Sequence, residues 1–131
     1  MIVLDASVLI AHFDATDVHH HRAGTLLLGV SDEPLAASPL TLAEVLVGPA
    51  RVGRMDCVTA ALRHLDVTSV SLEQDAALRL AALRTGTNLK LPDCCVLLAA
   101  EQTHAAVATF DDRLATTARE RGFAVREGHT E

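Results

Sequence analysis

The chain has 131 residues and a formal net charge of −6, from 11 basic and 17 acidic side chains. This length suits one domain, and a hydrophobic content of 50% excludes a disordered protein. The apolar runs are too short to span a membrane, and the first residues lack the basic start of a signal peptide. We therefore expect a cytoplasmic protein. Taken alone, its acidity argues against a nucleic-acid partner, because phosphate binding needs clustered basic residues.

The apolar pattern alternates between short strands and longer helices along the chain. Strands are predicted at 2–5, 35–38, 67–70, 105–109 and 123–125. Helices are predicted from Ser7 to Phe13, Asp17 to Val30, Thr41 to Val47, Met55 to Leu65, Ser71 to Gly86, Pro92 onward, and Asp112 to Arg121. Ser7 and Ser71 are the predicted helix caps, and Gly48-Pro49 is the predicted stop of the third helix. This order predicts one α/β domain over residues 1–126, with a mostly parallel five-stranded sheet flanked by helices on both faces, and a flexible tail at 127–131.

Four acidic residues fall at or near predicted strand ends. Asp5 ends the first strand and Asp111 follows the fourth, while Glu44 and Asp93 lie early in helices beside the sheet. Parallel sheets bind ligands outside the carboxyl ends of their strands, so these acids can share one pocket. Clustered carboxylates repel one another unless a cation is bound, and oxygen ligands suit Mg²⁺ or Mn²⁺. Such ions promote the hydrolysis of phosphodiester bonds.

Each acid also has a purely structural interpretation. Asp93 can stabilise a helix N-terminus, Glu44 can be an exposed helix residue, and Asp111 can cap the helix that follows it. Asp5 is the hardest to explain in this way, because it directly follows the apolar residues IVL. The four acids together carry the hypothesis of a metal site.

The ordered motifs resemble the PIN-domain ribonucleases, and within them the VapC-type toxins of toxin–antitoxin pairs. The segments that carry this resemblance are IVLDASVLIA, TLAEVLVG, LPDCCVLLAA and VATFDDRL, which together span the chain from its start to about Val125. Two positions depart from the pattern: Ser7 stands where threonine is frequent, and Phe110 stands where a polar residue is common. Both departures leave the carboxylates and the hydroxyl in place.

The resemblance implies a Mg²⁺-dependent endoribonuclease, with Mn²⁺ as a substitute ion. Asp5, Asp93 and Asp111 would bind the metal, and Glu44 would orient or deprotonate the attacking water. Ser7 and Thr109 would hold the metal ligands by hydrogen bonds. The family also implies a homodimer, a higher toxin–antitoxin complex, and a small antitoxin whose basic C-terminal segment reaches the acidic groove. An RNA-processing nuclease without a toxin role and a non-catalytic binding module remain alternatives.

The histidines, cysteines and basic residues add weaker signals. Three consecutive histidines, 19–21, point about 100° apart on a helix and cannot together chelate one ion, so a polar helix start or a partner surface is the favoured interpretation. The three cysteines are expected to be buried, reduced thiols. Four basic residues can contact RNA phosphates or can simply be solvated surface charges: Arg51, Arg54, Arg84 and Lys90.

Two other proteins with similar sheets are excluded at named positions. A haloacid-dehalogenase-type phosphatase needs a second aspartate two residues after the first, where this chain has Ser7. A response-regulator receiver needs an aspartate after the third strand and a lysine after the fifth. Here Ser71 and Leu72 follow the third strand, and the only lysine is Lys90.

Overall fold

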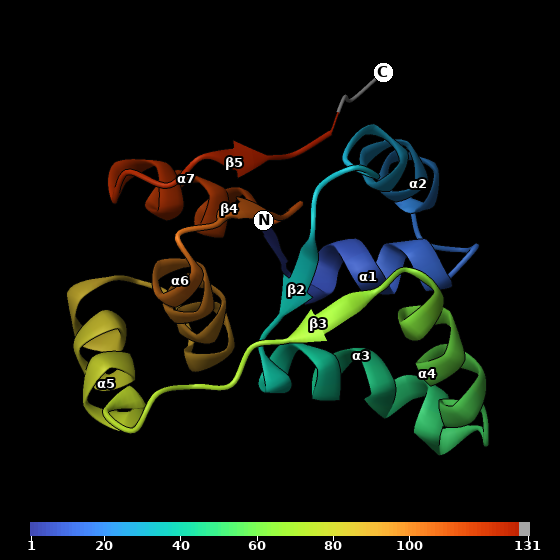
Figure 1. Cartoon of the computed structure of the whole chain (residues 1–131), viewed down its shortest axis with the longest axis horizontal. Coiled ribbons are helices and arrows are strands. Elements are labelled where there is room, and N and C mark those ends of the chain that lie inside the picture. Colours follow the sequence, from blue (N-terminus) through green and yellow to red (C-terminus); the bar gives the residue numbers. More distant parts are fainter. Residues whose placement is uncertain (129–131) are drawn as a thin grey trace.

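The computed structural model describes residues 1–128 of the chain. Five strands form one all-parallel sheet in the order β3-β2-β1-β4-β5 (Figure 1). The strands are β1 (Ile2–Leu4), β2 (Leu35–Ala37), β3 (Val67–Ser69), β4 (Ala106–Ala108) and β5 (Val125–Arg126). The helices are α1 (Ala6–Phe13), α2 (His20–Gly29), α3 (Pro39–Arg51), α4 (Met55–His64), α5 (Ala76–Gly86), α6 (Leu91–Thr103) and α7 (Asp112–Glu120). The predicted α/β class is confirmed.

Helices cover both faces of the sheet, as the sequence predicted (Figure 1). In β1, Val3 packs into one core with residues of α5, α6 and α7, while Ile2 and Leu4 pack into a second core with residues of α1 to α4. This alternation follows from the two-residue period of a strand. Helix α6 contains an unbroken buried run from Cys94 to Ala100, because it lies deepest in the first core.

Three predicted helix boundaries were wrong. Helix α1 begins at Ala6 with Asp5 as its N-cap residue, so Ser7 does not cap it. Helix α2 begins at His20 rather than Asp17, whose carboxylate instead accepts a hydrogen bond from the backbone N–H of His19 at 2.8 Å. The α5 helix begins at Ala76, five residues after the predicted cap Ser71. Residues that favour helix caps also suit turns and loops, which is where Asp17 and Ser71 lie, whereas Ser7 lies within α1.

Helix α3 continues through the predicted stop at Gly48-Pro49 and ends at Arg51. Ser38 caps it by accepting a hydrogen bond from the N–H of Thr41 at 3.3 Å, and Pro39 occupies the first turn, where the missing N–H costs nothing. Beyond the helix, Gly53 adopts a φ of 72°, which glycine tolerates best. The turn at Gly53 therefore lies five residues later than the stop that the sequence predicted.

The C-terminal end differs from the prediction in two ways. Strand β5 occupies Val125–Arg126 rather than 123–125, and Glu127 of the predicted tail pairs with Arg119 of α7. Residues 129–131 of that tail lie outside the described residues. Within residues 1–128, no helix is both long enough and apolar enough to cross a membrane.

Candidate active site

Asp5 forms the buried centre of the site. It follows β1, its residue is only 8% exposed, and its Oδ2 atom accepts hydrogen bonds from the Ser7 hydroxyl at 2.7 Å and the Thr109 hydroxyl at 2.8 Å. These hydroxyls in turn accept hydrogen bonds from the backbone N–H groups of Phe110, at 3.1 Å, and Asp111, at 3.0 Å. Backbone after β4 thus fixes the orientation of a carboxylate after β1, because the two strands are neighbours in the sheet.

Asp111 lies at the start of α7 and has a structural role. Its Oδ1 atom accepts hydrogen bonds from the backbone N–H groups of Arg113, at 2.9 Å, and Leu114, at 3.1 Å. This is the N-cap arrangement that satisfies unpaired donors of a helix. The cap uses Oδ1, so the second oxygen of this exposed residue carries the remaining capacity for a ligand.

Asp93 and Glu44 extend the acidic cluster from α6 and α3. Burial, and then the negative charges of Asp5, Asp111 and Glu44, raise the pKa of Asp93 to about 6, against the smaller opposing effect of Lys90. Burial and then the charge of Asp5 also raise the pKa of Glu44. The four predicted acids therefore lie within electrostatic range of one another.

The acids nevertheless do not form a closed chelating cage. In the part of the chain from Met1 to Gly128, no three His, Cys, Asp or Glu side chains converge tightly enough to hold a metal ion. The raised pKa values are compatible with this spacing, because Coulomb repulsion between carboxylates acts over longer distances than a metal–ligand bond. The cluster is electrostatically coupled, and a cation would have to draw its carboxylates together.

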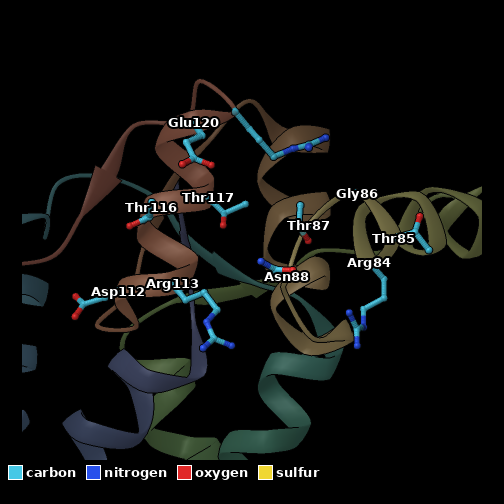
Figure 2. Close-up of a pocket in the computed structure, with 11 residues that line it drawn as sticks. Arg84, Thr85, Gly86, Thr87, Asn88, Asp112, Arg113, Thr116, Thr117 and Glu120 are labelled. Atoms are coloured by element: carbon cyan, nitrogen blue, oxygen red, sulfur yellow. The ribbon is translucent and has the colours of Figure 1, made fainter.

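Three hollows surround the acidic cluster. A cavity of about 470 Å³, which we call the acidic cavity, is lined by Asn88, Lys90, Asp93, Asp111, Asp112 and Arg113. A second hollow of about 520 Å³, the apolar groove, lies among α1, α3 and α4, and its lining includes Ile10, Phe13, Glu44, Val45, Val52 and Val58. A third of about 1060 Å³, the polar groove, lies between the end of α5 and α7, and its lining includes Arg84, Thr87, Asn88, Arg113, Thr117 and Arg121 (Figure 2).

The four basic residues considered from the sequence are separated by these hollows. Arg84 lines the polar groove and Lys90 lines the acidic cavity, whereas Arg54 lines the apolar groove and Arg51 lines none of the three. Arg113 lines both the polar groove and the acidic cavity and was missed. Its position at the start of α7, directly after the acidic pair 111–112, was the available signal.

Phe110 holds the loop that carries Thr109 and Asp111, and the sequence did not reveal how. The guanidinium of Arg22 lies 4.4 Å from the centroid of its ring, and the His19 ring lies 5.2 Å away at an interplanar angle of 41°. A cation over an aromatic ring is attracted by the ring quadrupole. Helix α2 therefore braces the site loop, through a contact between residues far apart in the sequence.

The histidines and cysteines among the described residues lie outside the acidic cluster's hydrogen-bond network, in helix contacts, in the core or at the surface. His20 opens α2 and its Nδ1 lies 2.8 Å from the carbonyl oxygen of Ala11, which ties α2 to α1. Burial, followed by the charge of His20, lowers the pKa of His12. Cys94 and Cys95 are buried, as expected, and burial raises the pKa of both thiols. The expectation for Cys57 was wrong: its thiol is exposed, because it lies on the outer side of α4.

Comparisons with known proteins concern the family and the fold. The PIN-domain family matches residues 2–120, while no curated protein gives a significant match. A toxin–antitoxin complex from Klebsiella pneumoniae contains a chain with 24% identity and a TM-score of 0.76, over 100% of both chains. The sarcin–ricin-loop-cleaving toxin VapC20 of Mycobacterium tuberculosis has 17% identity and a TM-score of 0.74, over 95% of this chain and 97% of that chain.

A third similar structure is VapBC2 of Rickettsia felis, bound to a DNA fragment from its promoter. It has 15% identity and a TM-score of 0.73, over 98% of this chain and 100% of that chain. At such identities the likeness concerns the fold. The family match, in contrast, includes the sequence segments that carry all four acids. The chain therefore belongs to the PIN-domain family.

Proposed function

We propose that this protein is a divalent-metal-dependent endoribonuclease that acts as the toxin of a toxin–antitoxin pair. The observation that carries the nuclease proposal is the buried Asp5 carboxylate, held by two hydroxyls, beside an Asp93 whose pKa is raised by the neighbouring acids. A bound cation would stabilise the ionised form of such a cluster, because it offsets the repulsion between the carboxylates. The donors are all carboxylate oxygens, which suit Mg²⁺, or Mn²⁺ as a substitute.

Asp5, Asp93 and Asp111 are the proposed ligands of that ion. When bound, the ion would supply Lewis acidity at the phosphate and lower the pKa of a bound water. Ser7 and Thr109 keep Oδ2 of Asp5 occupied, so Oδ1 is the atom of Asp5 left for a ligand. The raised pKa of Glu44 makes this carboxylate a stronger base than an ordinary glutamate, which suits a residue that accepts a proton from the attacking water.

The toxin role is supported by the apolar groove beside Glu44. Ile10, Val45 and Val52 line this hollow together with two carboxylates, Asp14 and Glu44, and one arginine, Arg54. An amphipathic helix with a basic residue fits the apolar walls and the excess of negative charge. A small antitoxin with a basic C-terminal segment has this chemistry. Similar folds occur in the Klebsiella pneumoniae toxin–antitoxin complex and in Rickettsia felis VapBC2. The homodimer, the higher complex and the cytoplasmic location remain predictions.

The test of the nuclease activity is RNA cleavage by the purified full chain with Mg²⁺, with Mn²⁺ and with EDTA. We expect cleavage with either ion and none with EDTA. Asp5→Asn and Asp93→Asn should each lower the rate by about 100-fold or more, since they remove ligands of the ion. The matched control is Asp32→Asn, at an exposed aspartate that lines none of the three hollows. Full metal-dependent cleavage by Asp93→Asn would contradict the site assignment.

The toxin role is tested separately in cells. Induction of the active chain should arrest growth, and co-expression of a small upstream reading frame with a basic C-terminal segment should relieve the arrest. Cleavage without growth arrest would favour an RNA-processing nuclease. A chain that binds RNA but never cleaves it would favour a non-catalytic binding module.

A further inference from the structure

The polar groove is continuous with the acidic cavity. The two hollows share Asn88, Asp112 and Arg113, and the groove extends from there between α5 and α7 to Arg121. Figure 2 shows Asn88 and Arg113 on facing walls, with Thr117 projecting from α7 toward the segment that carries Thr87. A ligand that reaches Asp93 and Asp111 through the cavity can therefore continue along the groove.

Basic side chains gather in this groove against the overall charge of the chain. Its lining holds three arginines (Arg84, Arg113 and Arg121) and two carboxylates (Asp112 and Glu120), a local balance of 3 − 2 = +1 in a chain of net charge −6. The only lysine, Lys90, lies in the adjoining cavity. Over the whole path four basic residues accompany four carboxylates, Asp93, Asp111, Asp112 and Glu120, so the positive balance belongs to the polar groove and the acids gather at the cavity end.

The remaining lining residues are donors and acceptors rather than apolar anchors. They are glycine, asparagine and threonines, including Thr116 and Thr117, with no aliphatic or aromatic side chain. Protein partners are usually anchored by buried aromatic or aliphatic residues, which this groove does not accommodate. Arginine, threonine and asparagine are the side chains that contact phosphate and sugar in nucleic acids.

We propose that the polar groove binds the single-stranded RNA that flanks the cleaved bond, with Arg84, Arg113 and Arg121 contacting its phosphates. This inference rests on the proposed nuclease function. Arg113 and Arg121 are eight residues apart, about 12 Å along the axis of α7, so they contact different phosphates of one extended strand. No aromatic ring lines the groove for base stacking. Contacts to phosphates carry no sequence information, so the contribution of the groove to binding is largely independent of base sequence.

The experiment measures binding of a fluorescein-labelled single-stranded RNA by anisotropy at several salt concentrations. The full chain carries Asp93→Asn, which keeps the strand intact, and the test pair is Arg84→Gln with Arg121→Gln. We expect about tenfold weaker binding, and a salt slope reduced by about 0.7 for each lost phosphate contact. The matched control is Arg51→Gln with Arg63→Gln, at two exposed arginines outside the groove, which should change neither quantity.

Other outcomes separate this proposal from the proposed function. In the active chain, the test pair should raise KM for RNA and leave kcat unchanged. Normal cleavage with unchanged RNA binding by the test pair, or no RNA binding at all, would overturn the groove assignment. Absent cleavage with arginine-dependent binding would refute the nuclease and keep the groove as an RNA site. Polyglutamate is added as a competitor of the labelled RNA. If it displaces this RNA as well as unlabelled RNA does, and the test pair weakens polyglutamate binding as much as RNA binding, the groove binds acidic peptides and the proposal is wrong.

Discussion

The two grooves beside the acidic cluster have opposite chemistry. The apolar groove is built by α1, α3 and α4 on one face of the sheet, and its walls include Ile10, Phe13 and Val52. The polar groove is built by α5 and α7 on the other face and has no aliphatic or aromatic lining. Glu44 lies in the first, whereas Asp93 and Asp111 line the cavity that adjoins the second.

This difference indicates how one acidic centre can serve two partners. A protein helix needs apolar contact area, and an RNA strand needs donors and positive charge. Because each requirement is met on a different side of the sheet, inhibitor and substrate would approach from different directions and meet only at the carboxylates. Under the proposed function, inhibition would act at the acids and would leave the polar groove open.

Among the further variants that compare the two sides, the largest effect is expected on the polar side, at Asp111. Asparagine caps helices about as well as aspartate, so Asp111→Asn should lower the free energy of unfolding by less than about 1 kcal/mol. Loss of the charge should nevertheless slow cleavage by about 10- to 100-fold. The measurements are cleavage rate and chemical denaturation, with Asp32→Asn as the control. A variant with unchanged cleavage would show that Asp111 is only a helix cap.

A smaller and selective effect is expected on the apolar side, at Val52. This side chain is 69% exposed and lines the apolar groove, so Val52→Glu should leave folding and RNA cleavage unchanged. It should weaken binding of the co-expressed upstream gene product by about tenfold, because a carboxylate replaces apolar contact area and must be desolvated. Val18→Glu is the matched control, at a valine that is 88% exposed and outside both grooves. Equal losses in both variants would remove the distinction between the grooves.

The sequence predicted the sheet and the placement of the acids for a general physical reason. Parallel strands end at one edge, so a residue directly after β1 and a residue shortly after β4 must be neighbours once those strands pair. This argument places Asp5 near Asp111 without any knowledge of side-chain contacts. The argument needs only the position where each strand ends, so even these short predicted strands were enough to place the two acids.

Details that depend on packing between distant segments were not predictable. Ser7 was interpreted as a helix cap, because a serine near a helix start has that preference, yet its hydroxyl serves Asp5. The predicted end of the third helix at Gly48-Pro49 was wrong, since α3 continues through both residues to Arg51. Val45, one turn before Pro49, is buried in the core and holds this part of the helix against the sheet. The contact of Arg22 with Phe110 and both grooves arise where helices from remote parts of the chain meet.

The smallest expected effect is on the pH dependence of the free energy of unfolding, measured in EDTA. It compares Asp93 on the polar side with Glu44 on the apolar side. Asp93 keeps its proton up to a pH of about 6 in the folded chain, whereas an unfolded aspartate loses it near about 3.9. Between these values the folded state binds more protons, so the free energy of unfolding should fall as pH rises, and should stay low above about 6. The raised pKa of Glu44 acts in the same direction.

Asp93→Asn should therefore flatten this fall more than Glu44→Gln, because burial and three acids raise the pKa of Asp93, whereas burial and one acid raise that of Glu44. Chemical denaturation of the full chain across this pH range measures the effect, with Asp32→Asn as the control. His12, whose pKa is lowered, contributes a rise in stability with pH near its own titration and is common to all variants. Added Mg²⁺ should reduce the fall in the unmodified chain, since a cation stabilises the ionised carboxylates. An unchanged pH profile in Asp93→Asn would mean that the pKa of Asp93 is not raised in the folded chain, and would remove this difference between the two sides.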